Sequence, residues 1–328
     1  MLACIVQKAV PGCAACRLWQ ECAHGAARRT AHNLRAFFAC TFKPRRRWGM
    51  AYIGILVLLA IIFYAVATLN PQAVSGWALG LERRRSGLVL KSQTIPGFTI
   101  PYLEGGQGQV LVLVHGFGGD KDNFTRMARH LTPHFRVLQP DLPGFGDATR
   151  DPAARYRMAD QVQRLQAFLQ ALGSPRIIMG GNSMGGFIAS EFAARYPDQV
   201  KAIWLLDAAG TAQAHQSPMF EEYMATGHSP LLLKSPSDVE QLIQATMSRP
   251  PYFPGFLKRS LGARAVADYA LHSEILKDLG LHSPLLESQY ANLPTPALIV
   301  WGSEDAILNP AAATVQQRIF PNSQLVVM

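Results

Sequence analysis

The sequence predicts an α/β fold: a mostly parallel sheet with helices on both faces, a helical cap insertion and an N-terminal transmembrane helix. Short apolar runs alternate with helix-like stretches from about residue 88 to residue 328. This alternation is typical of buried parallel strands joined by crossover helices. An uncharged run at 49–69 precedes this part, and a stretch without strand pattern interrupts it at about 213–290.

The spacing of apolar residues predicts the individual elements. Strands are expected at 109–116, 135–141, 176–180, 202–207, 296–302 and 323–328. Helices are expected at 122–131, 158–173, 185–197 and 311–320. In the second of these helices Val162, Leu165 and Leu169 recur on one face, and Gly173 ends the pattern. The interrupting stretch holds proline-punctuated apolar pieces such as "RPPYFPGF". Because loops of that length inside a domain are usually functional, we interpret it as a cap over the carboxyl edge of the sheet.

The positive charge of the chain is concentrated at its start. Residues 1–48 hold nine Lys/Arg and one acid, Glu21, so they contribute +8 of the formal net charge of +9. The nearly neutral remainder gives no indication of nucleic-acid binding. All five cysteines lie in the first forty residues, but "CAAC" at 13–16 has incomplete spacing for a zinc module. We interpret 1–48 as a disordered leader, or as sequence upstream of a true start at Met50, and expect neither a metal nor a cofactor.

Residues 49–69 are long and apolar enough to span a bilayer as a helix. The basic "KPRRRW" directly before this run predicts that the following domain lies on the periplasmic or extracytoplasmic side. The cluster Arg83–Arg85 weakens that orientation. We favour an uncleaved signal anchor, and the alternative is a cleaved signal peptide with "AVA" at 65–67 as its cleavage site. Residues 70–87 are then a juxtamembrane connector to the domain at 88–328.

One serine has the surroundings of a catalytic nucleophile. Ser183 lies in "GNSMG" at 181–185, between a predicted strand and a predicted helix. The pattern G-x-S-x-G in that context indicates a tight, strained turn that exposes the serine hydroxyl. The helix N-terminus adds a positive dipole beside it. The alternative is a glycine-rich turn with a silent serine.

A second glycine-rich turn predicts the stabilisation of a developing negative oxygen. His115–Gly119, "HGFGG", follows the first central strand. The backbone N–H of Phe117 and that of Met184, which follows the serine, are the two candidate donors of an oxyanion hole. One such donor contributes about 3 kcal/mol to the transition state. We expect His115 itself to brace the loop.

An acid is needed to orient the base that activates the serine. Asp305, in "WGSED", comes just after a predicted strand, where a carboxylate can hold an imidazole in the required tautomer. Asp207, at the end of "IWLLD", is a second candidate. We favour Asp305, although either residue could be an ordinary loop carboxylate.

These motifs together resemble those of the α/β-hydrolases. "HGFGGDKDNF", "DLPGFG", "GNSMGG" and "WGSEDAIL" occur in the order of that superfamily, from about Leu81 to Met328. The stretch is most similar to membrane-anchored monoacylglycerol lipases and related bacterial lipases and esterases. The resemblance implies a serine esterase that cleaves carboxylic esters, such as monoacylglycerols or other lipid esters, through an acyl-enzyme at Ser183. The apolar cap residues Phe253 and Phe256 are expected to contact the acyl chain.

The residue that would accept the proton of Ser183 is not found in the expected place. The resemblance places the catalytic histidine in a loop after the final strand, but all nine histidines precede Asp305. We therefore expect the sequence to be truncated before that histidine and the last helix, and the 328-residue chain to be inactive. Alternatively, His272 or His282 of the cap substitutes. Two other functions remain open: a carbon–carbon bond hydrolase of the meta-cleavage type, and a membrane-tethered lipid-binding protein without turnover.

Overall fold

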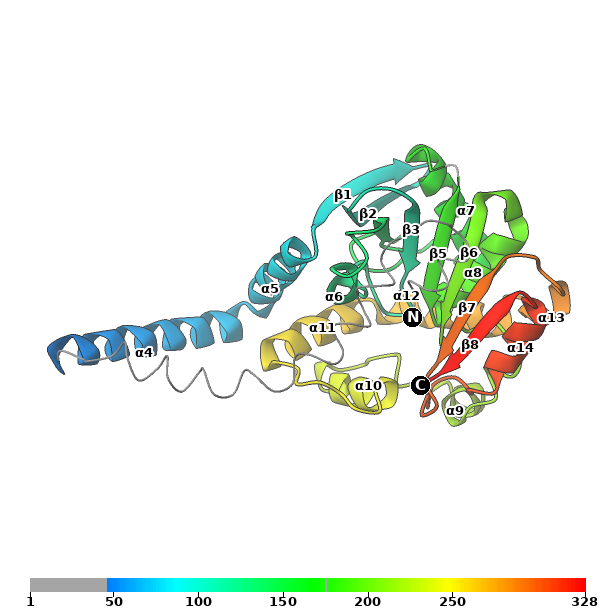
Figure 1. Cartoon of the computed structure of the whole chain (residues 1–328). Helices are drawn as coiled ribbons and strands as arrows, with labels where there is room; N and C mark the ends of the chain where they lie inside the picture. The colour runs from blue at the N-terminus through cyan, green and yellow to red at the C-terminus, as the bar shows by residue number, and fades with distance from the viewer. Residues whose placement is uncertain (1–45, 175) are drawn as a thin grey trace, which may run out of the picture. The chain divides into compact units, whose positions relative to one another are not determined.

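The computed structural model describes residues 46–174 and 176–328, and it separates the chain after Asn70 into two units (Figure 1). The described part of the first unit is helix α4, Arg46–Leu69. Its segment Tyr52–Leu69 has a mean hydropathy of 2.6, and by length and composition it could cross a membrane. The five cysteines of the predicted leader lie outside the described residues.

The second unit, Pro71–Met328, is the α/β domain. Up to the sixth strand its elements are α5 (Pro71–Arg85), β1 (Leu88–Ile95), β2 (Phe98–Gly105), β3 (Val110–Val114), α6 (Thr125–Ala128), β4 (Arg136–Pro140), α7 (Met158–Ala171), β5 (Ile177–Asn182), α8 (Met184–Arg195), the 3-10 helix η2 (Pro197–Gln199) and β6 (Val200–Leu206). The rest comprises α9 (Pro218–Thr226), the 3-10 helix η3 (Pro236–Asp238), α10 (Val239–Thr246), α11 (Gly255–Ala267), α12 (Tyr269–Leu281), α13 (Leu286–Gln289), β7 (Ala297–Trp301), α14 (Ala312–Ile319) and β8 (Ser323–Val327).

The eight strands form one sheet in the order β1-β2-β4-β3-β5-β6-β7-β8. β1 and β2 are antiparallel to each other, β2 is antiparallel to β4, and all later neighbours are parallel. The predicted fold class is therefore confirmed. The hairpin β1–β2 is an addition to the predicted strands. Most of β1 is exposed, and its apolar residues are interrupted by the polar Lys91–Thr94, so it lacks the continuous apolar run that marks β3, in which all five residues are buried.

The central strands lie between helices, as their apolar sequences require. Large aromatic side chains fill the core around them, among them Phe168 of α7 and Phe187 and Phe192 of α8. The helix predicted at 122–131 is shorter than expected, because only Thr125–Ala128 are helical. The residues before it form turns in which Asn123 and Thr125 donate to the carbonyls of Asp120 and Asp122.

The segment between β6 and β7 contains helices α9 to α13, and we call its part α9–α12 the cap. Figure 1 shows α9 and α10 near the end of the sheet at which β8 finishes. The cap has a small core of its own, formed by Leu233, Val239 and Ile243, with Phe253 packed against it. The loop after α10 therefore sits above the carboxyl ends of the strands, where parallel sheets bind their ligands.

Candidate active site

Ser183 stands in the strained turn that its sequence predicts. Its backbone has φ 53° and ψ −117°, between β5 and α8. A Cβ at Gly181 would lie 2.1 Å from the carbonyl oxygen of Gly185, and a Cβ at Gly185 would lie 2.1 Å from that of Val114. No side chain fits at either place. A non-glycine residue at positive φ is costly, and it persists only where its surroundings fix it. Here the Ser183 N–H donates to Leu206 O at 3.0 Å.

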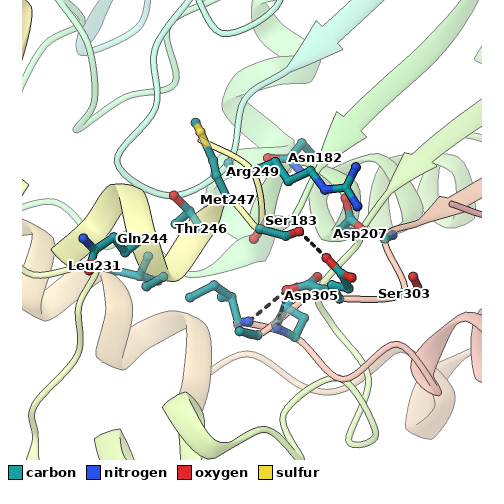
Figure 2. Close-up of a pocket in the computed structure, with 18 of the residues that line it drawn as sticks. Asn182, Ser183, Asp207, Leu231, Gln244, Thr246, Met247, Arg249, Ser303 and Asp305 are labelled. Carbon is teal, nitrogen blue, oxygen red and sulfur yellow. Dashed lines mark hydrogen bonds between the residues drawn. The ribbon is translucent and has the colours of Figure 1, made fainter. Parts of the chain in front are cut away.

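A cavity of about 670 Å³ opens above this turn and brings the predicted residues together (Figure 2). Ser183 from β5, Asp207 after β6 and Asp305 after β7 all line it, together with Phe117. These residues are far apart in sequence, and they meet because the carboxyl ends of neighbouring parallel strands share one edge of the sheet.

The two candidate oxyanion donors flank the serine. Gly116 is so close that a Cβ on it would lie 3.3 Å from Ser183 Cβ. Met184 is the first residue of α8, where helical geometry supplies no acceptor for the N–H. Within the described residues, neither the Phe117 N–H nor the Met184 N–H donates to a carbonyl or side chain. The side chain of Met184 is buried and does not line the cavity, so only its backbone can take part.

His115 braces the oxyanion turn, as expected. Its Nε2 accepts from the Leu142 N–H at 3.0 Å, and its Nδ1 lies 2.8 Å from Gly116 O. These partners require a neutral ring with the proton on Nδ1. Complete burial lowers the pKa of His115, which favours the same neutral form. Both ring nitrogens are thus used to fix the loop.

Two carboxylates face the cavity, and each is held by backbone N–H groups. Oδ1 of Asp305 accepts from Ile307 at 2.8 Å and Leu308 at 3.0 Å. Oδ1 of Asp207 accepts from Gly302 at 2.7 Å. Burial raises the pKa of Asp305 above its ordinary value. Burial, together with the charge of Asp305, raises the pKa of Asp207 to about 6. Both acids remain candidates by position.

Seven of the nine histidines lie in the described part of the chain, and none of them lines the cavity. His272 Nε2 lies 3.1 Å from Gly144 O, and its ring contacts Phe145 and Phe117. His282 is exposed, with Nδ1 2.8 Å from Asp278 Oδ1. Neither cap histidine therefore lies where it could take the proton of Ser183.

The cap supplies cavity residues that no sequence pattern predicts. Met247 and Arg249 line the cavity from the loop after α10, and Ser248 donates to Glu304 in the loop after β7. No repeated motif marks these positions, and the fold alone places them opposite Ser183.

Within residues 46–174 and 176–328 there is no group of three or more His, Cys, Asp or Glu that could hold a metal ion.

The strand order and the strained serine between β5 and α8 define an α/β-hydrolase. The α/β-hydrolase fold family matches residues 109–328, which is more than half of the chain. Lipase 1 of Psychrobacter immobilis is 38% identical over 252 residues, covering 75% of this chain and 79% of the relative. A crystal structure of a membrane phospholipase A, a bacterial virulence factor, aligns with a TM-score of 0.77 and 36% identity. That alignment covers 85% of this chain and 90% of the other.

A more distant relative is Monoacylglycerol lipase ABHD6 of Mus musculus, 23% identical over 293 residues, which cover 84% of this chain and 86% of the relative. The chain belongs to the α/β-hydrolase family. Within it, the chain is a carboxylic ester hydrolase of the lipase and esterase type. The resemblance seen in the motifs is thereby confirmed.

Proposed function

We propose that the protein hydrolyses lipid esters through an acyl-enzyme at Ser183. An imidazole oriented by Asp305 takes the proton of the Ser183 hydroxyl while Oγ attacks the ester carbonyl. The Phe117 and Met184 N–H groups stabilise the resulting oxyanion. The protonated imidazole then gives its proton to the leaving alcohol. Water, activated by the same imidazole, hydrolyses the acyl-enzyme and frees Ser183.

The strained turn at Ser183 carries this proposal. A φ of 53° at a non-glycine residue is retained at functional sites, and here two free backbone donors lie beside it. In this proposal the imidazole comes from outside the described residues. Asp305 is the favoured acid because two N–H groups fix its Oδ1, against one for Asp207, and its Oδ2 remains for the imidazole.

The proposed substrates are esters with a long acyl chain, such as monoacylglycerols. The cavity volume of about 670 Å³ lies in the range of sites for small organic ligands. Apolar side chains, including Leu231 and Ile307, line it. The relatives named lipases and monoacylglycerol lipase support the same class.

The proposed location is a membrane, with α4 as a single-pass anchor and the hydrolase domain on the periplasmic or extracytoplasmic side. The apolar segment Tyr52–Leu69 supports an anchor. The basic residues directly before it support the orientation, because such residues tend to stay cytoplasmic.

A fluorophosphonate probe tests the chemistry, since it phosphonylates an activated serine. Ser183→Ala should abolish labelling of the purified full chain. Asp305→Asn should remove most of the acceleration that added free imidazole gives, because the acid that orients the imidazole is then lost. Asp207→Asn is the matched control, because it removes the neighbouring carboxylate. Added free imidazole, which the cavity has room for, should speed labelling of the unmodified chain but not of Ser183→Ala.

Two results would contradict the proposal. Labelling that persists in Ser183→Ala would show that another residue reacts. A loss in Asp207→Asn greater than in Asp305→Asn would move the orienting role to Asp207.

A further inference from the structure

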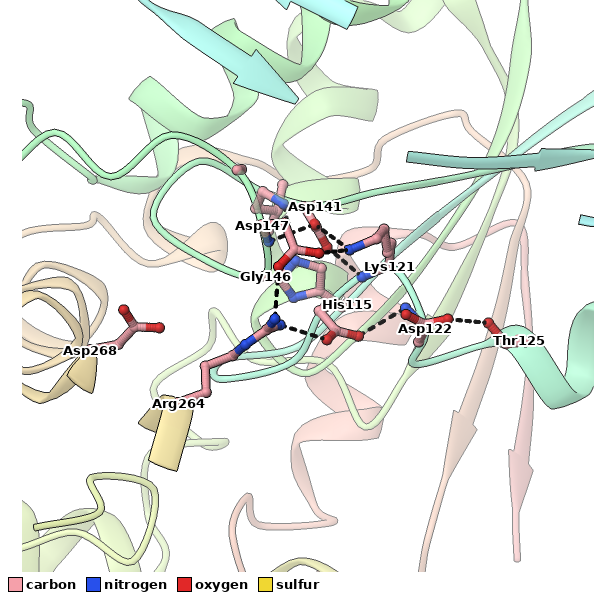
Figure 3. Close-up of polar contacts among 12 residues, drawn as sticks. His115, Lys121, Asp122, Thr125, Asp141, Gly146, Asp147, Arg264 and Asp268 are labelled. Carbon is pink, nitrogen blue, oxygen red and sulfur yellow. Dashed lines mark hydrogen bonds and ion pairs between the residues drawn. The ribbon is translucent and has the colours of Figure 1, made fainter. Parts of the chain in front are cut away.

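A group of charged residues surrounds the turn that carries the oxyanion donor Phe117. We call residues 115–122 the oxyanion loop. Its last three residues, Asp120, Lys121 and Asp122, are all charged, and each makes ion pairs or hydrogen bonds with a different part of the domain. Figure 3 shows Lys121 beside Asp141 and Asp147, with Arg264 directed toward the same group. None of these three residues lines the cavity, and the proposed chemistry uses none of them.

Lys121 ties the oxyanion loop to the core. Its side chain is only 1% exposed. The ammonium Nζ donates to Asp141 Oδ2 at 2.8 Å and to Asp147 Oδ2 at 2.6 Å, and the Lys121 N–H donates to Asp141 Oδ1 at 2.7 Å. A buried ammonium with these partners fixes the position of the backbone that carries it.

Two arginines from outside the core hold the same loop. Arg83 of α5 forms a bidentate pair with Asp122, with Nε to Oδ1 at 2.7 Å and Nη2 to Oδ2 at 2.5 Å. Arg264 of α11 donates from Nη2 to Asp147 Oδ1 at 2.7 Å and from Nη1 to Asp120 Oδ2 at 3.3 Å. Bidentate guanidinium pairs fix geometry as well as charge. The juxtamembrane helix and the cap therefore both hold the oxyanion loop.

The arginines also offset most of the excess negative charge behind the oxyanion hole. Four carboxylates belong to this group, those of Asp120, Asp122, Asp141 and Asp147, against the single ammonium of Lys121, which donates to Asp141 and Asp147. Burial and the charges of Asp122 and Asp141 raise the pKa of Asp120 above its ordinary value, a sign of this crowding. Without the arginines, excess negative charge would lie behind the hole in which an oxyanion must form. Asp268 does not add to this excess, because Arg150 pairs with it at 2.6 Å.

The cap also contacts the donor residue. The ring of Phe117 packs edge-on against His272 of α12 and against Phe145, each with ring centroids 5.5 Å apart. The position of Phe117 thus depends on α12 directly and on α11 through Arg264.

We propose that Arg83 and Arg264 are positioning residues that hold the oxyanion loop in its catalytic place, so that hydrolysis depends on α5 and α11 being seated on the domain. This inference rests on the proposed role of the Phe117 N–H. Neither arginine touches the reacting atoms, so α5 and α11 affect hydrolysis only through the oxyanion loop.

The test compares Arg83→Gln and Arg264→Gln with Lys258→Gln in the full chain. Lys258 is the matched control, because it lies on α11 and pairs with Glu240 of α10 at 2.5 Å but does not reach the oxyanion loop. Each arginine variant should lower kcat for p-nitrophenyl butyrate, or the labelling rate at Ser183, about tenfold. Loss of a whole donor would lower it on the order of 10²–10³. KM should stay within about twofold, since the ground state gains little from the oxyanion hole.

Hydrogen exchange gives a readout that does not need turnover. The amides of 116–119 should exchange faster in Arg83→Gln and Arg264→Gln than in Lys258→Gln, at a temperature where all three remain folded. Arg83→Lys and Arg264→Lys are milder variants, and they should recover part of the protection by restoring charge without the bidentate geometry.

The outcomes separate the two proposals. If the unmodified chain reacts at Ser183, but the arginine variants match Lys258→Gln in rate and in exchange, the positioning role is wrong. If nothing reacts at Ser183 while exchange at 116–119 still responds to the arginines, the proposed chemistry fails and the structural coupling stands. A rise in KM without a fall in kcat would also overturn the positioning role, because it would indicate a substrate-binding effect.

Discussion

Ser183 shows how much of a strained turn is set by the side chains that its neighbours lack. The backbone reaches φ 53° there because two glycines leave room for carbonyl oxygens 2.1 Å from where a Cβ would be. The strained turn could therefore be predicted from the sequence, because the constraint is local and each glycine in "GNSMG" has a steric reason. The sequence also predicted that Asp305 and Asp207 follow the ends of strands. Only the strand order shows that they share one cavity with Ser183.

Gly185→Ala tests the steric constraint. The new Cβ would meet Val114 O at 2.1 Å, a backbone atom in the central strand β3 that cannot move away easily. We expect a loss of about 3 kcal/mol or more in the free energy of unfolding, measured by urea denaturation. Gly76→Ala in α5 is the control. Nothing lies within 4 Å of its Cβ, and alanine favours a helix, so no loss is expected. Equal effects of the two changes would contradict the steric argument.

Asp207→Asn tests the buried carboxylate through the pH dependence of stability. The folded-state pKa of about 6 lies above the ordinary value of 3.8, so the folded state prefers the protonated form. The stability contributed by that form is fully present below pH about 4 and is lost as the pH rises through about 6. Because asparagine cannot ionise, the variant should be more stable than the original at pH 8, by about 3 kcal/mol.

At pH 4 the difference in stability between Asp207→Asn and the original protein should largely disappear. Thermal unfolding at pH 4 and pH 8 measures this difference. The exposed Asp198→Asn serves as control. A variant that is less stable at pH 8 than the original would show that Asp207 is held as a favourable anion.

At the scale of elements, the cap shows that apolar composition predicts helices but not their partners. Its helical character followed from proline-punctuated apolar pieces, but the roles of those pieces depend on packing. Phe253 was expected to contact the acyl chain, and the structure instead packs it against Leu233, Val239 and Ile243 in the small core of the cap. Neither Phe253 nor Phe256 lines the cavity, whereas Met247 does. Apolar composition alone does not distinguish a cap core from a substrate surface.

A pair of substitutions separates those two roles. Met247→Asp should lower hydrolysis of long-chain esters several-fold more than that of acetate esters, because it places a charge on the wall of the cavity. Phe253→Ala should lower both to a similar extent and destabilise the protein by about 2–4 kcal/mol, through the cavity left in the cap core. Ratios of kcat/KM for butyrate and dodecanoate esters, measured with thermal unfolding, check both. The assignment fails if Phe253→Ala is the chain-length-selective variant.

At the scale of the whole molecule, the proposal that the apolar helix α4 anchors the enzyme in a membrane can be tested. Two charges at its centre, in Leu58→Arg together with Ile62→Arg, should cost about 5–7 kcal/mol of membrane insertion. The double variant should shift from the carbonate-resistant membrane fraction to the soluble fraction, while Trp77→Arg in α5 should leave the partition unchanged. Retention of the double variant in the membrane fraction would exclude α4 as the anchor.

The whole molecule also explains which site features sequence could not reveal. Arg83 pairs with Asp122, and Arg264 pairs with Asp120, which lies 144 residues away in the chain. No periodicity or motif connects such positions, because they meet only after α5 and α11 pack on the domain. In contrast, the parallel pairing of the central strands was implied by the alternation of apolar runs and helices, since each parallel pair needs a crossover.

The order of the strands has a consequence for synthesis on the ribosome. From β6 onward each new strand pairs with the one made before it, so the sheet can grow at one edge while the chain emerges. β6 must wait for β7, because residues 207–296 lie between them. At ordinary translation rates that interval lasts roughly 5–20 s. During this time β6 is a nascent edge to which another chain could pair. A cap that begins to form its own core would shorten the length of unfolded chain in that interval. Rare codons after β6 would lengthen the interval, so they should lower the yield of native enzyme.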